Sequence, residues 1–292
     1  MKNLAIGVDV GGSHVCSAVI DLTAGQIIGQ RIQTDIPHTA PADELFAAWA
    51  DNIAQCIKQA PEPVTRIGMD FPGPFDYANG ISQMDHKLPH IKGLHVADEL
   101  RKRIPGGENL EFRFVNDASA FALGECHFGA ARGVEKVVVL AIGTGFGSGF
   151  VSGGKIVEDG ETVPPGGEVW NLPWAGSIAD DWFSTRGILA RYKTLTGEEL
   201  EGAKDVADRY ATDPAAQDTW HAFGRELAQF TARLIQNFGA TTILLGGNIA
   251  RSLHLFQPEM EKAYASVGLN ADIKPCALLS DAAMMGAATL FV

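Results

Sequence analysis

Apolar runs broken by turn-forming residues dominate the first part of the chain. Residues 4–10 form such a run, and Gly11-Gly12 separates it from an alternating stretch that begins at His14. Glycine pairs between apolar runs favour a tight turn, so consecutive strands are predicted here. Apolar side chains then recur at steps of three and four, the spacing of an amphipathic helix, until Pro61 ends the pattern. The elements predicted in this part are strands at 4–10, 14–21, 27–32, 64–71 and 112–115, and helices at 43–59 and 117–128.

A similar order of elements follows in the second part. The clearest pattern is at 214–238, where large apolar residues recur on one helical face. Asp213 is a favourable cap for the first turn of this helix, and Gly239 is typical of a helix end. Residues 153–176 are rich in glycine and proline and are predicted to form loops with short strands. The elements predicted in this part are strands at 136–142, 147–151, 241–245 and 272–276, and helices at 178–195, 214–238, 249–267 and 281–290.

Each part of the chain starts with a strand, a glycine-rich turn and a second strand. This repetition indicates an internally duplicated architecture. Strands and helices mix along the whole length, which places the chain in the α/β fold class. A length of 292 residues suits about two domains, or one large one.

Composition narrows the classes of function. The chain has 23 lysines and arginines against 35 aspartates and glutamates, a formal charge of −12, which argues against a general nucleic-acid binder. No stretch approaches the roughly 18 uninterrupted apolar residues of a membrane span, and the first residues lack the features of a signal peptide. The 4 cysteines are far apart and form no CxxC pair, which is typical of reduced thiols. We therefore expect a cytoplasmic protein that binds neither nucleic acid nor membranes.

Glycine clusters mark the candidate chemistry, and the first is Gly11-Gly12 after Asp9. Two glycines let the backbone approach a bound group closely, and successive N–H groups can face an anion. Ser13 adds a hydroxyl donor, and Asp9 is placed to hold a hydrated magnesium ion. An ordinary hairpin explains the same residues, since Gly-Gly is also a strong hairpin signal. The motif alone leaves both interpretations open.

The second cluster, Gly143 to Gly149, places four glycines at alternating positions between two predicted strands. A hairpin needs fewer glycines, and their alternation clears one face of the strand for phosphates or sugar. Thr144 and Gly145 lie at the turn. Neither the Rossmann nor the P-loop spacing is present, because no helix-opening GxGxxG and no final Gly-Lys-Ser/Thr follows. We predict a phosphate-binding turn of another kind.

Asn116 and Asp117 lie where a predicted strand meets a predicted helix. A helix N-cap is one interpretation of the aspartate. The other is a catalytic base, since a carboxylate at the carboxyl end of a strand lies in the crevice of an α/β sheet. Gly246-Gly247 occupies a similar junction, where the start of a helix can face a nucleotide.

Together these motifs, in this order, resemble those of the ROK family (repressors, open reading frames and sugar kinases) of the actin-like ATPase superfamily. The resemblance runs from about residue 5 to residue 290. The matching segments are Asp9–Ser13 with DxGGT, Phe71–Asp76 with PGPxD, Asn116–Ala120 with NDAxA, Gly143–Gly149 with GTGxGxG, Gly167-Glu168 with the start of GExGH, Gly246-Gly247, and Met285–Ala288.

The resemblance implies two ribonuclease-H-like domains on either side of a cleft, a smaller one at 1–117 plus 280–292 and a larger one at 118–279. It implies ATP as donor, Mg²⁺ held by Asp9 and the donor phosphates, and a hexose acceptor whose C6 hydroxyl loses its proton to Asp117. The implied sugar contacts are Pro72, Gly73, Asn116, Glu168, Asn171 and Asp180. The implied donor contacts are Asp9, Gly11, Gly12, Ser13, Gly143, Thr144, Gly145, Gly246 and Gly247. A homodimer is expected on the same ground.

Three departures from the family pattern bear on metal and substrate. Asn171 stands where the family has a histidine, and residues 175–180 replace its CxCGxxGC segment, so we predict no structural zinc. Residues 179–184 are similar to the zinc-free segment of polyphosphate glucokinases, and either Asp180 or Asp181 replaces a sugar-binding carboxylate of the family. Lys87 stands where relatives often carry asparagine. Recognition of an anionic substituent and simple exposure to solvent are both open for it.

The leading hypothesis is an ATP-dependent hexokinase of the glucokinase type. A polyphosphate-dependent glucokinase is an alternative, although the charge of −12 disfavours a long polyanion groove. A non-catalytic sugar-binding protein is another, and the retention of Asp9 and Asp117 weighs against it. The family's transcriptional repressors carry a helix-turn-helix before the kinase-like fold, whereas Leu4 begins the first strand directly here, so we expect no DNA-binding module. The preferred sugar stays open.

Overall fold

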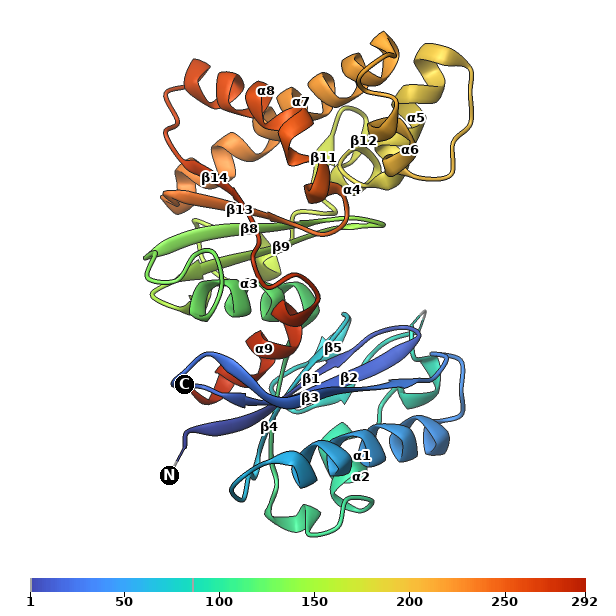
Figure 1. The fold of residues 1–292 in the computed structure, drawn as a ribbon, viewed down its shortest axis with the longest axis vertical. Coiled ribbons are helices and arrows are strands. Elements are labelled where there is room, and N and C mark those ends of the chain that lie inside the picture. Colours follow the sequence, from blue (N-terminus) through green and yellow to red (C-terminus); the bar gives the residue numbers. More distant parts are fainter. Residues whose placement is uncertain (1, 86) are drawn as a thin grey trace. The chain divides into compact units, whose positions relative to one another are not determined.

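The computed structural model describes residues 2–85 and 87–292. By its internal contacts the chain divides into two compact units, Met1–Gly129 with Ser280–Val292, and Ala130–Leu279. Each unit holds a five-stranded sheet of mixed direction with helices packed on it (Figure 1). This mixture confirms the α/β fold class.

The sheet of the first unit has the strand order β3-β2-β1-β4-β7. Its strands are β1 (Leu4–Val10), β2 (His14–Asp21), β3 (Gln26–Asp35), β4 (Arg66–Phe71) and β7 (Glu111–Asn116). The first three form an antiparallel meander, while β4 and β7 run parallel to β1. Because β1 is central and covered on both faces, it is apolar almost throughout, and within it only Asp9 is partly exposed. The carboxyl ends of β1, β4 and β7 share one edge, which carries Asp9, Asp70 and Asn116.

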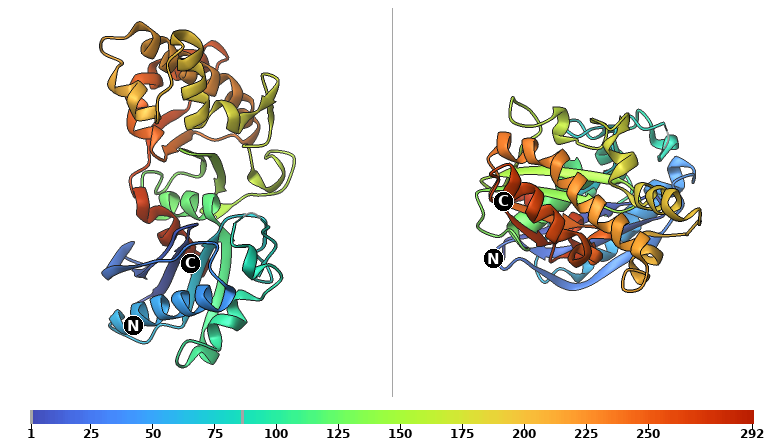
Figure 2. Two further views of the ribbon diagram at one scale, coloured as in Figure 1. Left: turned by 90° about the vertical axis from the view of Figure 1, so that its right-hand side faces the viewer. Right: turned by 90° about the horizontal axis from the view of Figure 1, so that it is seen from above.

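Helices cover both faces of this sheet. α1 (Ala42–Gln59) packs on one face over the meander, with α2 (Val96–Arg101) beside it, and α3 (Asp117–His127) and α9 (Ala282–Ala288) lie on the other face (Figures 1 and 2). The helix that ends the fold thus packs on the strand that begins it.

α3 and α9 approach until their backbones touch. A Cβ built on Gly286 would lie 1.7 Å from the carbonyl oxygen of Ala120, and one built on Gly124 would lie 2.1 Å from that of Ala282. Only glycine fits at these two positions. The contact keeps α3 with the first unit, which therefore continues to Gly129 instead of stopping at residue 117.

The sheet of the second unit has the strand order β10-β9-β8-β13-β14. Its strands are β8 (Lys136–Ile142), β9 (Phe146–Ser152), β10 (Lys155–Ile156), β13 (Thr242–Gly246) and β14 (Asp272–Pro275). β8 and β9 form an antiparallel hairpin, β13 runs parallel to β8, and β14 runs parallel to β13. Both sheets therefore combine an antiparallel hairpin with parallel strands that follow it.

The long helix of the second unit, α7 (Pro214–Phe238), has the bounds and caps that the sequence predicts. The Asp213 carboxylate accepts a hydrogen bond from the N–H of Ala215 at 2.8 Å, and Gly239 ends the helix with φ 74°. α8 (Leu253–Ser266) packs along it (Figure 2), and the Trp220 and Phe256 rings stack between them with centroids 5.7 Å apart. Both rings belong to the hydrophobic core of the second unit.

Two helices predicted as continuous are interrupted. The predicted helix 178–195 is α4 (Ala179–Trp182) followed by α5 (Thr185–Thr196), because the backbone at Ser184 is extended and the N–H of Thr185 donates to Gly143 O at 2.8 Å. The predicted helix 249–267 begins with the 3₁₀ helix η4 (Ile249–Ser252), since Ser252 leaves the α region at ψ 17° before α8 starts.

Shorter elements complete the fold. They are β5 (Phe75–Asp76), β6 (Ile81–Ser82), β11 (Pro173–Trp174), β12 (Ser177–Ile178), α6 (Ala203–Asp208), and the 3₁₀ helices η1 (Pro89–Ile91), η2 (Gly107–Asn109), η3 (Pro165–Gly167), η5 (Leu279–Asp281) and η6 (Thr289–Phe291). Across residues 2–85 and 87–292, no helix combines the length and apolar character needed to cross a membrane.

Candidate active site

The site residues predicted from the sequence fall into two groups, one in each unit. The first unit carries Asp9, Gly11, Gly12, Ser13, Pro72, Gly73, Asn116 and Asp117. The second unit carries Gly143, Thr144, Gly145, Glu168, Asn171, Asp180, Gly246 and Gly247.

The turn between β1 and β2 presents backbone N–H groups outward. Its carbonyl oxygens are already occupied, because Gly12 O accepts from the N–H and from Nδ1–H of His38, both at 3.0 Å, and Ser13 O accepts from Ile36 N at 3.0 Å. The N–H groups of Gly12 and Ser13 make no hydrogen bond within the described chain. A Cβ built on Gly12 would meet no atom within 4 Å. The turn therefore has the donors and the open space that an anion requires.

Two carboxyl groups lie together at the end of the strands behind this turn. Asp9 and Asp70 are paired in register, and Asp70 is completely buried. Among the described residues, the Asp70 oxygens have only the Asp9 carboxyl and the backbone N–H of Val10 as hydrogen-bonding neighbours. Burial, together with the charges of Asp9 and Asp117, raises the pKa of Asp70 well above its ordinary value. A proton held on Asp70 and shared with Asp9 satisfies both groups.

Asn116, and not Asp117, is the side-chain cap of α3. Its Oδ1 accepts from two N–H groups at the start of the helix, at 2.9 and 3.3 Å. Its Nδ2 donates to the Tyr77 hydroxyl at 3.1 Å, and that hydroxyl donates to Phe71 O at 3.1 Å. The amide of Asn116 also hydrogen-bonds the neighbouring Asp117 carboxylate, so the cap and Asp117 are linked.

Asp117 is the first residue of α3 and remains partly exposed. Its Oδ1 accepts from Ala118 N at 2.8 Å, which leaves Oδ2 for another partner. Burial raises the pKa of Asp117, whereas the Ala118 N–H and the charge of Lys87 lower it. A carboxylate with a raised pKa accepts a proton more readily than an ordinary aspartate, which suits a general base.

Lys87 projects from a loop that two buried residues anchor. Leu88 and Ile91 are 1% and 0% exposed, whereas Lys87 is exposed and has no ion-pair partner among residues 2–85 and 87–292. Leu88 adopts φ 49°, in the left-handed region that leucine rarely occupies. The loop holds Lys87 within electrostatic reach of Asp117 at a cost in backbone strain.

Pro72 and Gly73 follow β4 and reach the same edge of the sheet. A Cβ built on Gly73 would lie 3.7 Å from the Tyr77 hydroxyl oxygen and 4.0 Å from Asn116 Nδ2. Pro72 is buried, whereas Gly73 is partly exposed. The structure thus brings Gly73 together with Asn116, as a shared ligand contact requires.

In the second unit, the turn Gly143–Gly145 is held from two sides. The Gly143 carbonyl accepts hydrogen bonds from the N–H of Thr185 at 2.8 Å and from its hydroxyl at 3.0 Å. The Asp180 carboxylate accepts from the N–H of Phe146 at 2.6 Å. Thr144, at the tip, is exposed, and a Cβ built on Gly143 would meet only Asn248 N, at 4.0 Å. The turn is rigid at its base and open at its tip.

Gly246 and Gly247 lie against the base of this turn. Gly247 has φ 84°, and a Cβ built on it would lie 2.3 Å from the carbonyl oxygen of Ile142, so no other residue fits there. The end of β13 and the end of β8 are therefore in contact where both strands lead into glycine turns. The predicted donor contacts of this unit lie together.

Asp180 and Asp181 have different surroundings. Asp180 faces the glycine turn and is 15% exposed, while Asp181 is 41% exposed and accepts a hydrogen bond from Ser177. Arg186 forms ion pairs with both carboxylates. Hydrogen bonds from Ser177 and Arg186 lower the pKa of Asp181. Of the two, Asp180 is the residue associated with the turn.

Glu168 and Asn171 lie in an exposed segment beside β9. Ser148 fixes that segment, because its hydroxyl donates to Gly167 O at 2.6 Å and accepts from Val169 N at 3.2 Å. Glu168 accepts a hydrogen bond from the indole N–H of Trp170 at 3.0 Å. Both predicted sugar contacts are accessible to a ligand.

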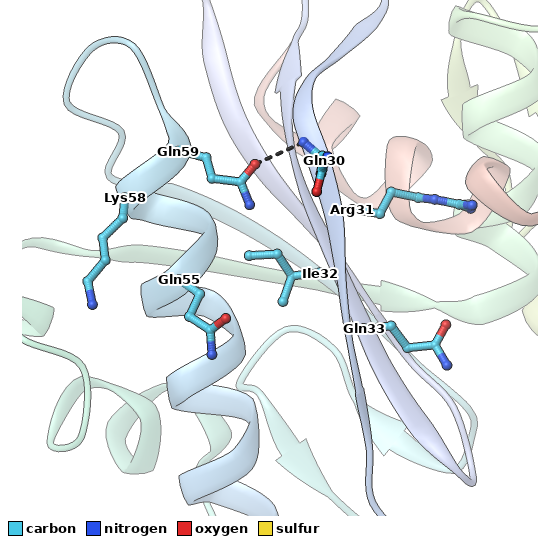
Figure 3. Close-up of a pocket in the computed structure, with 7 residues that line it drawn as sticks. All are labelled: Gln30, Arg31, Ile32, Gln33, Gln55, Lys58 and Gln59. Atoms are coloured by element: carbon cyan, nitrogen blue, oxygen red, sulfur yellow. Dashed lines mark hydrogen bonds between the residues drawn. The ribbon is translucent and has the colours of Figure 1, made fainter.

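Two hollows of the described chain are lined almost entirely by other residues. One, of about 480 Å³, lies between β3 and α1, where Gln59 accepts from the Gln30 N–H at 2.8 Å and Arg31 points toward Asp281 instead of into the hollow (Figure 3). The other, of about 750 Å³, lies between α5 and α7. Of the predicted sugar or donor residues, only Asp181 lines either one.

The carboxylates of the described chain form no metal site of their own, but Asp9 suits contact with a hydrated magnesium ion. Within the described part of the chain, no group of three or more His, Cys, Asp or Glu side chains is arranged to hold a metal ion. A hydrated Mg²⁺ needs only one or two carboxylates when substrate phosphates supply other oxygens. Asp9, partly exposed beside a turn with open space, meets that smaller requirement. The absence of structural zinc stays a prediction.

Several residues of the site escaped sequence reasoning. Asp70 could have been noticed as a charged residue inside an otherwise apolar strand, and His14 as a polar residue next to the first glycine pair. Tyr77 and Thr185 gave no such signal, because their contacts with Asn116 and Gly143 join segments far apart in the sequence.

The family follows from a comparison over nearly the whole chain. The model of the ROK family matches residues 5–167 and 174–292. The chain belongs to the ROK family. The unmatched residues of this ROK protein, 168–173, include Asn171, where the sequence departs from the family pattern.

Named relatives of this ROK protein include two sugar kinases. A glucokinase of Thermotoga maritima is 29% identical, with 98% of this chain and 96% of the relative covered. An N-acetyl-D-glucosamine kinase of Haemophilus influenzae is 27% identical, with 86% of each covered. Among solved structures, the ROK hexokinase of Thermus thermophilus has a TM-score of 0.80 at 22% identity, covering 98% of this chain and 96% of that one. The structural likeness confirms the actin-like ATPase fold.

Proposed function

We propose that this ROK protein is a hexokinase of the glucokinase type that transfers the terminal phosphoryl group of ATP to the C6 hydroxyl of a hexose. The observation that carries the proposal is the setting of Asp117, a partly exposed carboxylate with a raised pKa. It lies at the same edge of the sheet as a turn with free N–H donors. The two sugar-kinase relatives support this activity.

In the proposed reaction, Asp117 Oδ2 accepts the proton of the sugar hydroxyl. The hydroxyl oxygen forms a bond to the terminal phosphorus while the bond from that phosphorus to the ADP oxygen breaks. Ala118 N holds Oδ1 at 2.8 Å, which fixes the orientation of the carboxylate. A positioned general base typically contributes about 10²- to 10⁴-fold to the rate, and positioning with charge stabilisation supplies most of the rest.

The proposed donor contacts are the two glycine turns. In the first unit, the N–H groups of Gly12 and Ser13 would bind phosphate oxygens, with Gly11 allowing close approach. In the second unit, Gly143–Gly145 and Gly246-Gly247 would accept the rest of the donor. Asp9 is the residue that would hold a hydrated Mg²⁺ here, and that ion would supply positive charge to the donor phosphates.

The proposed acceptor contacts are groups that remain able to donate or accept hydrogen bonds. In the first unit they are the side-chain amide of Asn116 and the backbone at Pro72 and Gly73. In the second unit, Glu168 and Asn171 are exposed, and Asp180 adds a carboxylate beside the glycine turn. Sugar hydroxyls both donate and accept, so a mixed set of amide and carboxylate partners suits them.

The test is Asp117→Asn, which keeps the acceptor for Ala118 N but is not a base. We expect kcat to fall about 10²- to 10⁴-fold with little change in KM for either substrate. A coupled ADP-release assay measures both constants. Asp98→Asn, an exposed aspartate of α2, serves as the matched control and should retain full activity.

Urea unfolding of Asp117→Asn should match that of the original protein, because the capping contacts remain. Turnover within threefold of the original rate would rule out Asp117 as the base. The same assay, run with glucose, mannose, fructose and N-acetylglucosamine against ATP and polyphosphate, identifies the sugar and the donor. Activity with polyphosphate alone would favour the polyphosphate glucokinase that residues 179–184 resemble, and activity with none would favour a sugar-binding protein.

A further inference from the structure

The imidazole of His14 lies over the first glycine turn. A Cβ built on Gly11 would be 3.7 Å from its Cε1 and 3.9 Å from its Nδ1. The N–H of Gly11 donates to the His14 carbonyl at 3.0 Å, which closes the turn. Ser13 Oγ and His14 Nδ1 are 3.1 Å apart, within hydrogen-bond distance. Backbone and side chain therefore both fix the position of this ring.

The hydrogen bond to Ser13 decides what the other ring nitrogen offers. When the Ser13 hydroxyl donates to Nδ1, the neutral ring carries its proton on Nε2. Within the described chain, Nε2 has no hydrogen-bond partner. His14 as a whole is only partly buried. The ring thus adds a directed donor to the free N–H groups of Gly12 and Ser13.

The other groups around the turn favour an anion at this point. The carbonyl oxygens of Gly12 and Ser13 already accept hydrogen bonds from His38 and Ile36. They therefore do not point their negative ends at an anion bound to the turn. Burial raises the pKa of Asp9, and the electrostatic effect of nearby His14 offsets part of that rise. A ring so placed can face a phosphate beside the aspartate.

We propose that His14 binds the terminal phosphoryl group of the donor through Nε2–H, together with the N–H groups of Gly12 and Ser13. The ligand class is a chain of phosphates with a free end, whether a nucleoside triphosphate or an inorganic polyphosphate. The assignment of this phosphate as a donor rests on the proposed function, whereas the binding itself does not.

The test compares His14→Gln, whose amide cannot place a donor where the ring holds Nε2–H, with His14→Lys, whose longer side chain carries an N–H donor outward. Calorimetry measures binding of tripolyphosphate, a non-hydrolysable ATP analogue and AMP. We expect His14→Gln to weaken the first two about tenfold to a hundredfold, the range for a hydrogen bond to a charged group. AMP binding should be unchanged, and His14→Lys should recover most of the loss.

His95→Gln, an exposed histidine at the start of α2, is the matched control and should bind all three ligands normally. Ser13→Ala, which removes only the hydroxyl that orients the ring, should weaken tripolyphosphate binding by a smaller factor. It should add little in the double variant with His14→Gln, because both changes remove one contact. Circular dichroism and thermal melting verify that each variant is folded.

Unchanged tripolyphosphate affinity in His14→Gln would overturn the inference. So would an equal loss for AMP, since the ring would then act on the nucleoside or on the fold. If the variant loses tripolyphosphate affinity but no sugar is phosphorylated by the original protein, the proposed function fails and the inference stands. If sugar is phosphorylated and His14→Gln leaves KM for ATP unchanged, the inference alone fails.

Discussion

At the scale of single residues, the charge of Lys87 acts on Asp117. Lys87 is exposed, yet its loop is anchored by buried Leu88, so the cation stays near the carboxylate and lowers its pKa. The sequence left the role of this lysine open between an anionic substrate and solvent. The structure adds an electrostatic role, because burial alone would raise the pKa of Asp117 further.

Lys87→Met should therefore raise the pKa of Asp117. A general base works only when ionised, so the acidic limb of the pH profile of kcat/KM should move to higher pH. Lys92→Met is the control, because Lys92 lies in the same loop but pairs with Asp85 at 2.5 Å. The measurement is the pH profile of kcat/KM for the original protein, Lys87→Met and Lys92→Met. An acidic limb of Lys87→Met that stays in place or moves to lower pH would contradict the prediction.

The raised pKa of Asp70 leads to a separate prediction about the pH dependence of stability. Its pKa is raised from 3.8 in the folded protein, so its contribution to the free energy of unfolding is complete below pH 3.8 and is lost as the pH rises toward the folded pKa. Each unit of difference in pKa is worth about 1.4 kcal/mol. Asp70→Asn has no group to ionise and should gain stability relative to the original protein as the pH rises.

Urea unfolding between about pH 4 and pH 8 measures this difference, which should be smallest at the acidic end. Asp98→Asn, with an exposed side chain, should show no comparable trend. A difference between Asp70→Asn and the original protein that stays constant over this range would show that Asp70 does not titrate as its surroundings require.

At the scale of elements, the break between α4 and α5 supports the second glycine turn. Thr185 gives both its N–H and its hydroxyl to the Gly143 carbonyl, and neither is then available for a continuous helix. The apolar spacing of 178–195 predicts one helix and does not reveal this break. The spacing of apolar residues indicates which side chains are buried, but it does not indicate the hydrogen-bond partner of a single backbone N–H such as that of Thr185.

Thr185→Val keeps the shape of the side chain and removes one of these two hydrogen bonds. We expect KM for ATP to rise about fivefold, which corresponds to roughly 1 kcal/mol for one hydrogen bond. Thr194→Val on the same helix is the control, because that hydroxyl only donates to the Ala190 carbonyl at 2.8 Å. Equal kinetics for the two variants would mean that the Thr185 hydroxyl has no part in holding the turn.

Elements with strong local signals were predictable, and those set by distant contacts were not. The strands 4–10 and 136–142 and the helix 214–238 have the predicted bounds, because apolar runs and caps lie within each segment. β3 extends to Asp35, beyond the predicted end at 32, because its pairing with β2 continues through polar residues. In the candidate site, Asp117 and the glycine turns could be found from motifs, whereas the partners Tyr77 and Thr185 required the fold.

At the scale of the whole molecule, each sheet ends in glycine turns. In the first sheet the carboxyl ends of the parallel strands β1 and β4 lie side by side, and in the second sheet those of β8 and β13 do. The candidate residues follow these strand ends. This arrangement explains why motifs scattered from Asp9 to Gly247 belong to two small regions. Ligands of open α/β sheets bind at such edges.

The close packing of α9 on the first unit has a consequence for how the protein is made. A Cβ on Gly7 or Gly68 would lie 1.9 Å from a carbonyl oxygen of that helix, so β1 and β4 are shaped to receive it. On the ribosome, however, α9 emerges only after all of residues 130–279. The nascent first sheet must wait with the part of its face that α9 covers still exposed, while the later unit can already close, and exposed apolar surface of this kind favours aggregation.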